Sequence, residues 1–116
     1  TEGVFDLEFH HGDCVGVDAE SALLVHNFAP EAAIICHPPL YATYRANTCI
    51  NTVVNEPLDY MVRNRNIVNS VEKMFVVPEN YMEVARSGTW ATYRYAINHC
   101  VPCIIIFPNG RVEYSA

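Results

Sequence analysis

A turn near the start of the chain has the composition of a ligand-binding loop. It reads HHGDCVGVD over residues 10–18 and lies between an expected strand and an expected helix. Glycines let the backbone approach a ligand, and the free amides at the start of a helix can bind an anion. The carboxylates could orient ribose hydroxyls, although a plain glycine turn with Asp18 as the helix N-cap is the alternative. The candidate ligand-binding residues here are Gly12, Asp13, Cys14, Gly16 and Asp18.

A second segment, RSGTWAT over residues 86–92, also follows an expected strand and enters an expected helix. Serine and threonine hydroxyls, a glycine and N-terminal helix amides are the groups that bind a phosphate. This is the stronger loop, because hydroxyls, a glycine and a cation occur together. Alternatively, Ser87 caps the helix and needs no ligand. The candidate residues of this segment are Ser87, Gly88, Thr89 and Thr92.

Two arginines lie in the third segment, RNRN over residues 63–66. Cations early in a helix oppose its dipole, so local stability does not favour them there. Guanidinium groups bind phosphates and carboxylates through paired hydrogen bonds, which makes Arg63 and Arg65 candidate ligand-binding residues. A solvated helix face with surface ion pairs is the alternative.

The composition limits the class of protein. The chain has 116 residues, of which 51% are hydrophobic and 17% charged, and this suits one folded domain over residues 1–116. Seven basic and 13 acidic residues give a net charge of −6, which argues against sequence-blind binding to duplex DNA. The longest apolar stretch is too short to cross a membrane, and no signal peptide is recognisable. We therefore expect a cytoplasmic protein.

The five cysteines cannot form a complete set of disulfides, because their number is odd. Only Cys100 and Cys103 form a C-x-x-C motif, and it leads into an expected strand, whereas redox motifs begin helices. A zinc site would need a second such pair or histidines at ligand spacing. We expect reduced packing cysteines, no metal and no cofactor.

The expected elements alternate between strands and helices. Hydrophobic patterning predicts strands over 4–9, 32–36, 52–55, 73–77, 103–107 and 111–114, and helices over 18–27, 57–71 and 88–98. This order is typical of a mostly parallel sheet with helices on both faces, a Rossmann-like three-layer α/β fold. The aromatic helix face of Trp90, Tyr93 and Tyr95 exceeds what one short sheet buries, so we expect a homo-oligomer.

In the order in which they occur along the chain, the three segments resemble the SLOG superfamily of Rossmann-like nucleotide-binding domains. HHGDCVGVDAE is similar to the HGDCxGAD turn of small SLOG proteins in bacteria and their phages. VRNRNIVNSVEKMFVVP followed by RSGTWATYRYA resembles the RNR and SG-x-x-x-T-x-x-A pattern of the DNA-processing protein DprA. The resemblance covers about residues 7 to 110. Members of the family usually carry an earlier strand that ends in a G-x-R motif, about a strand and a helix before the HGDC turn, and this strand-helix unit has no counterpart in this sequence.

The resemblance implies a ligand that carries a phosphate or a ribose phosphate, held by the first turn, Arg63 and the Gly88 loop. In the related LOG phosphoribohydrolases, that loop reads PGG-x-GT-x-x-E with a catalytic glutamate. Gly88 and Thr89 match its GT, and Thr92 falls at the glutamate. Threonine cannot replace a carboxylate in acid–base chemistry. Glu79 and Glu83, in the preceding loop, are possible replacements.

Three functions follow from these observations. The leading hypothesis is a module that binds a nucleotide or a nucleotide-derived ligand as a sensor or by sequestering it. The alternative is a nucleoside-phosphate N-glycosidic hydrolase that uses another carboxylate. A further alternative is DprA-like binding of single-stranded DNA, which the acidic net charge disfavours.

Overall fold

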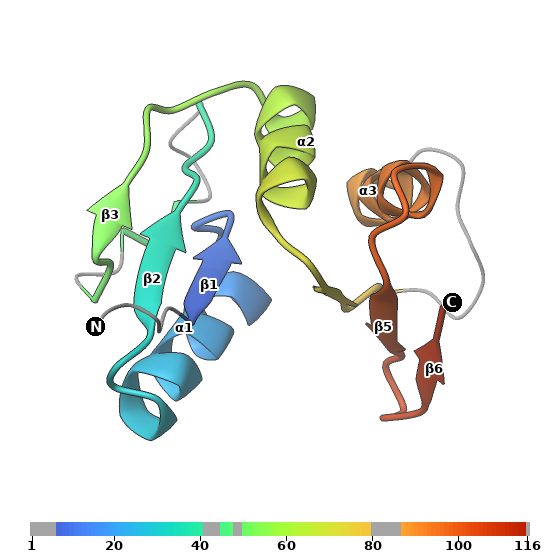
Figure 1. Cartoon of the computed structure of the whole chain (residues 1–116), viewed down its shortest axis with the longest axis horizontal. Coiled ribbons are helices and arrows are strands. Elements are labelled where there is room, and N and C mark those ends of the chain that lie inside the picture. Colours follow the sequence, from blue (N-terminus) through green and yellow to red (C-terminus); the bar gives the residue numbers. More distant parts are fainter. Residues whose placement is uncertain (1–6, 41–44, 48–49, 80–86, 116) are drawn as a thin grey trace. The chain divides into compact units, whose positions relative to one another are not determined.

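The computed structural model describes residues 7–40, 45–47, 50–79 and 87–115 (Figure 1). The chain divides into two compact units, Thr1–Arg63 and Asn64–Ala116. Each unit contains its own small β-sheet.

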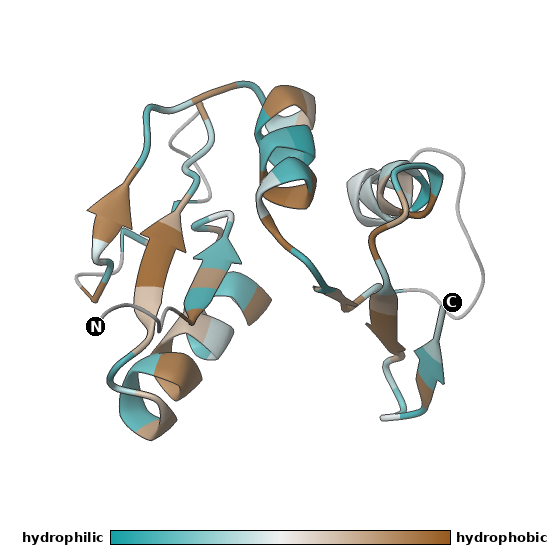
Figure 2. Ribbon diagram, in the orientation of Figure 1, coloured by the Kyte–Doolittle hydropathy of each residue, from teal (hydrophilic) through white to brown (hydrophobic). Residues whose placement is uncertain are grey.

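The first unit is built on a parallel sheet with the strand order β1-β2-β3. β1 spans Glu8–His11, β2 spans Ala33–Cys36 and β3 spans Val53–Val54. Helix α1, Val17–Phe28, connects β1 to β2. β2 is apolar along its length, as suits a central strand, whereas β1 carries polar side chains (Figure 2). Buried Ile34 and Cys36 of β2, with Ala22 of α1, contribute to the core of this unit.

Helix α2 spans Tyr60–Ser70, with its first residues in the first unit and its last in the second. It begins three residues after Pro57, the position at which the sequence predicts a helix start. Arg63 is buried on this helix, and Val68 is buried one turn later.

The second unit contains a sheet with the order β4-β5-β6. β4 (Met74–Val76) and β5 (Cys103–Ile106) are parallel, and helix α3 (Gly88–Asn98) lies between them in the sequence. β6 (Val112–Tyr114) pairs with β5 in the antiparallel direction after a turn in which Gly110 has a φ of 87°. A positive φ of this size favours glycine. The core of this unit consists of Val68, Val76, Trp90, Ala96, Cys103, Ile105 and Phe107.

Over the described residues, these elements confirm an α/β protein with three helices and two small sheets, the first parallel and the second mixed. The predicted helix over 88–98 is observed with the same bounds. The assignment of His10 and His11 to the first turn is wrong, because both lie in β1, where they pair with Ile35 and Cys36 of β2. Residues 4–6 of the first predicted strand lie outside the described residues. A single domain over residues 1–116 stays a prediction, and no helix in the described ranges is long and apolar enough to cross a membrane.

Candidate functional site

The candidate site lies at the carboxyl ends of the parallel strands of the first unit. The turn of residues 12–16 continues β1 into α1, and His37 follows β2. Asn55 follows β3, and its backbone amide donates to the carbonyl of Cys36 at 2.9 Å. Polar groups from three strand ends therefore gather along one edge of the sheet.

Asp13 determines the conformation of the turn. Its side chain is completely buried, and its φ of 58° lies in the left-handed region. One carboxylate oxygen accepts from Nε of Arg45 at 2.7 Å, and the other accepts from the amide of Asn47 at 3.1 Å. The carbonyl of Asp13 also accepts from the amide of Ala46 at 2.8 Å. The carboxylate therefore fastens residues 45–47 to the turn, and its predicted contact with a ligand stays a prediction.

Arg63 fastens the same turn from the other side. Its Nη1 donates to the carbonyl of Gly12 and, at 3.1 Å, to the carbonyl of His37, while its Nη2 lies 3.9 Å from Sγ of Cys14. A Cβ on Gly12 would lie 2.6 Å from that Nη1, so a larger residue here would displace the guanidinium of Arg63. Arg63 thus links the ends of β1 and β2. Its predicted contact with a phosphate is not among these interactions and stays a prediction.

The start of α1 differs from the alternative in which Asp18 is the N-cap of the helix. Gly16, with a φ of 92°, is the N-cap residue and forms no side-chain cap, so the alternative of Asp18 as N-cap is wrong. Asp18 lies inside the first turn of the helix, and its carboxylate accepts from the amide of Cys14 at 3.1 Å. Burial, followed by the charge of Asp18, raises the pKa of the Cys14 thiol. Cys14 is therefore a neutral thiol in the turn.

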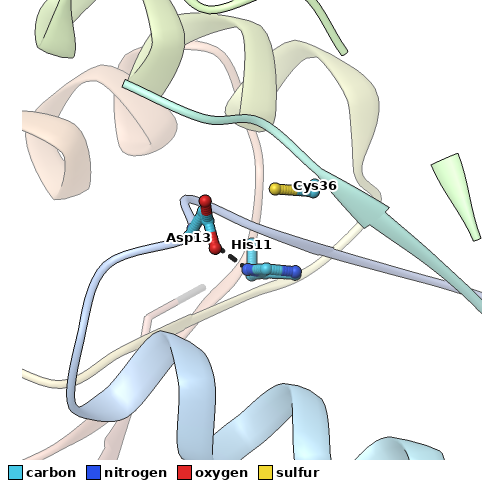
Figure 3. A group of neighbouring side chains, drawn as sticks. All are labelled: His11, Asp13 and Cys36. Carbon is cyan, nitrogen blue, oxygen red and sulfur yellow. Dashed lines mark hydrogen bonds between the residues drawn. The ribbon is translucent and has the colours of Figure 1, made fainter. Parts of the chain in front are cut away.

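His11, Asp13 and Cys36 bring three potential metal ligands within 4.8 Å of one another (Figure 3). Hydrogen bonds already occupy the nitrogens of His11: Nδ1 accepts from the amide of Asp13 at 3.0 Å, and Nε2 lies 2.7 Å from Oδ1 of Asn51. Both oxygens of Asp13 are bound as well. Burial raises the pKa of Cys36 to about 12, so this thiol keeps its proton. The group fits a buried hydrogen-bond network better than a metal centre.

A second polar cluster involves His10, His37 and their neighbours. Nδ1 of His10 lies 2.8 Å from Nε2 of His37, and Nε2 of His10 lies 2.9 Å from Oε1 of Glu8. Nδ1 of His37 lies 3.3 Å from Nδ2 of Asn55. Burial lowers the pKa of His37 to about 4, and the charges of His10, His11 and Arg63 act in the same direction. His37 is therefore neutral at neutral pH.

The predicted residues of the second unit lie around the start of α3 and on α2. Ser87 is the N-cap of α3, and its Oγ accepts from the amide of Trp90 at 3.3 Å, as the capping alternative predicts. Gly88 and Thr89 are exposed, whereas Thr92 is buried and donates its hydroxyl to the carbonyl of Gly88 at 2.8 Å.

The other residues named for this part of the chain differ in how far the structure describes them. Arg65 of α2 lies over the ring of Tyr95, with Cζ 5.5 Å from the ring centroid. Glu79 is exposed. Glu83 lies outside the described residues, as does Arg86, the cation of the second loop.

Four residues of these two polar clusters were not singled out from the sequence: Arg45, Asn47, Asn51 and Asn55. Arg45, Asn47 and Asn51 lie in the segment of residues 40–51, for which the sequence predicts no helix or strand, and Asn55 is the last residue of the strand predicted over 52–55. Three are asparagines, a residue typical of loops, so their local sequence gives no sign of a shared role.

Comparisons of the chain with protein-family models, with curated proteins and with solved structures found no match.

Proposed function

We propose that the chain binds a nucleotide or a nucleotide-derived ligand, as a sensor or sequestering module, on a Rossmann-like three-layer α/β fold. The observation that carries the proposal is the gathering of polar groups at the carboxyl ends of β1, β2 and β3. Open α/β sheets bind their ligands beyond this edge. The strand-helix-strand order β1-α1-β2, with both strands parallel, also supports the fold.

The turn between β1 and α1 is held by buried side chains, and part of it is exposed. Asp13 and Arg63 are buried and hold the turn through the contacts described above. Val15 and Gly16 are exposed, and the N-terminus of α1 has no side-chain cap. Because Gly16 has no side-chain oxygen to accept from them, the backbone amides at this helix start can donate to an anion. A loop that is already ordered loses little entropy when it binds.

Within the second unit considered by itself, the start of α3 offers a phosphate contact on similar grounds. Gly88 and Thr89 are exposed in the first turn of that helix. The Oγ of Ser87 accepts one hydrogen bond from Trp90, and its own hydroxyl hydrogen can still donate. Hydroxyl and amide donors at a helix start suit a phosphate.

The proposal is for binding without hydrolysis. Thr92 stands where the resembling hydrolases carry their glutamate, and its hydroxyl donates to the carbonyl of Gly88. A buried hydroxyl that already donates to its own helix does not supply acid–base catalysis.

Thermal denaturation and calorimetry of the full chain test the proposal. The probes are adenosine and guanosine monophosphates, NAD, ADP-ribose and a cyclic dinucleotide, each followed by product analysis. A ligand present at a hundred times its Kd stabilises the folded state by about 2.7 kcal/mol. Stabilisation of this size produces a readily measured rise in Tm. We expect at least one probe to raise Tm and to be recovered unchanged. If no probe at millimolar concentration changes Tm or releases heat, the proposal is wrong.

A pair of charge substitutions locates the binding. Val15 in the turn is 60% exposed and Leu24 on α1 is 57% exposed, so glutamate at either position disturbs folding to a similar, small extent. Val15→Glu places a negative charge beside the start of α1, whereas Leu24→Glu places it about two turns farther along the helix. We expect Val15→Glu to weaken anion binding and Leu24→Glu to leave it nearly unchanged. Equal effects of the two substitutions would place the ligand elsewhere.

A further inference from the structure

Four residues on the strands and strand ends of the first unit form a continuous line of hydrogen bonds. Glu8 contacts His10 at 2.9 Å, His10 contacts His37 at 2.8 Å, and His37 contacts Asn55 at 3.3 Å. The side chain of Glu8 is 55% exposed, whereas the side chain of His10 is 7% exposed and His37 is 6% exposed. The line therefore runs from solvent, through two buried imidazoles, to the carboxyl end of β3.

The hydrogen-bonding chemistry gives every link the same direction. A carboxylate only accepts, so Nε2 of His10 carries a proton toward Glu8. Nδ1 of His10 then accepts, and Nε2 of His37 must donate to it. Nδ1 of His37 is left as an acceptor, and it faces the amide nitrogen of Asn55, which only donates. The two ends of the line thus require the same pair of tautomers.

The backbone around His37 is held firmly. Its amide donates to the carbonyl of His11 at 2.8 Å, and its carbonyl accepts from Arg63 at 3.1 Å. Asn55, by contrast, is exposed, and its side chain can turn away when another donor takes its place. Nδ1 of His37 is therefore held in place as an acceptor, and a bound donor can replace its partner Asn55.

We propose that Glu8, His10 and His37 form a proton relay between solvent and the ligand-binding edge, and that Nδ1 of His37 accepts a proton from a hydroxyl or water bound there. The inference rests on the proposed function, because it places the ligand at the same edge. It adds proton acceptance from a bound hydroxyl group, of a sugar or of water, to the binding of an anion.

The step balances in atoms and charge. The hydroxyl proton moves to Nδ1 of His37, the Nε2 proton of His37 moves to Nδ1 of His10, and the Nε2 proton of His10 moves to Glu8. The bound oxygen gains the negative charge that Glu8 loses, and both imidazoles stay neutral. Return of the proton along the same path restores the starting tautomers.

The surroundings of His37 favour this neutral transfer over a lasting imidazolium. Arg63 of α2 contacts the carbonyl of His37, and His11 of β1 faces the other network. Burial and these groups disfavour a positive charge on His37, whose pKa falls to about 4. A transfer that leaves both rings neutral avoids that charge.

Nuclear magnetic resonance of the ¹⁵N-labelled full chain tests the relay without any ligand. The imidazole nitrogen shifts report which nitrogen carries the proton. At neutral pH we expect the proton on Nε2 in both His10 and His37. A proton on Nδ1 of His37 would overturn the proposal.

Substitution of the outer residue separates a relay from a static hydrogen-bonded line. Glu8 is linked to His37 through His10, and Glu8→Gln keeps a hydrogen-bonding group of the same shape. We expect this change to slow exchange of the His37 ring proton with water by at least about tenfold, a modest share of what positioned acid–base groups contribute. His10→Gln, which bridges but cannot pass a proton, should slow exchange similarly.

The matched control is Glu31→Gln, an exposed glutamate of the same unit that precedes β2. Exchange at His37 should be unchanged in this variant, and equal exchange in Glu8→Gln and Glu31→Gln would overturn the relay. Failure of nucleotide binding would instead appear in the thermal and calorimetric experiment, while the tautomers and exchange rates stayed as expected. The two proposals can therefore fail separately.

Discussion

Arg45 and Asp13 form an ion pair with 2.7 Å between Nε and Oδ2, although they lie 32 positions apart in the chain; the side chain of Asp13 is completely buried and that of Arg45 is 23% exposed. The pair joins the loop after β2 to the turn after β1. Because Asp13 is fully buried in a left-handed conformation, the turn depends on this distant partner for its charge balance.

Removal of Arg45 should destabilise the protein strongly. Arg45→Met leaves the carboxylate of Asp13 buried without its cation, and the loss of one partner of such a pair costs about 3–5 kcal/mol. Urea denaturation measures the free energy of unfolding. Asp13→Asn combined with Arg45→Met should lose less than the sum of the single changes, since neither charge is then left alone.

Arg111→Met provides the control for that experiment. Arg111 and Glu113 form a pair at 3.1 Å in which both side chains are about half exposed. Exposed pairs contribute up to about 1 kcal/mol, so this variant should unfold near the same urea concentration as the parent. If Arg45→Met were as mild as Arg111→Met, the turn would not depend on the Asp13 pair.

Alanine at Gly12 should destabilise the protein, while alanine at Gly88 should not. The added Cβ at Gly12 would meet the buried guanidinium of Arg63 at 2.6 Å, and overpacking of this kind costs about 1–3 kcal/mol. A Cβ at Gly88 meets no atom within 4 Å, and alanine suits a helix start better than glycine. Thermal denaturation of the two variants compares them directly. Equal Tm values would contradict the close approach of Arg63 to the turn.

Acid should weaken the protein through His37. Its pKa falls from 6.5 to about 4 on folding, so the unfolded chain binds more protons between these values. The contribution of neutral His37 is complete above about pH 6.5 and decreases as the pH falls toward 4. Between pH 7.5 and pH 5, the shift corresponds to about 2 kcal/mol of lost stability.

Urea titrations at the two pH values measure that loss. His37→Asn should show less dependence on pH than the parent, whereas His26→Gln, at an exposed position on α1, should retain the parent's dependence. The same dependence in the parent and in His37→Asn would assign the acid sensitivity to other groups.

The cysteines should differ in their reaction with iodoacetamide. Cys100 is exposed, whereas Cys36 and Cys103 are buried, and burial raises the pKa of both of these thiols. Thiolates are the reactive form, so at pH 7.5 Cys100 should be modified first and the two buried residues only in denaturant. Peptide mass analysis identifies the modified residues. Early modification of Cys36 would contradict the packing of β2.

Local patterns in the sequence determined the secondary structure. The apolar run at β2, the helical spacing after Gly88 and the Asn109-Gly110 turn predict elements that the structure contains. These signals depend on residues close together in the chain, so they can be interpreted without a fold. The strand predicted over 4–9 ends two residues before β1 does, because His10 and His11 do not resemble residues of a buried strand.

Local sequence patterns identified only part of the candidate site. The sequence identified Gly12, Asp13 and Arg63 as important, but as ligand contacts. The tertiary structure shows what each of them contacts within the protein: Asp13 binds Arg45, and Arg63 binds the carbonyls of Gly12 and His37. Their partners lie 26 to 51 residues away.

The difference has a simple physical cause. Secondary structure follows from short-range backbone geometry and hydrophobic periodicity, whereas a buried ion pair or a line of histidines forms only when distant strands meet. The sequence by itself determined an α/β chain with a polar glycine turn before its first helix. Only the tertiary structure decided that the buried charges of that turn neutralise and support one another, and that His10, His37 and Glu8 lie in one hydrogen-bonded line.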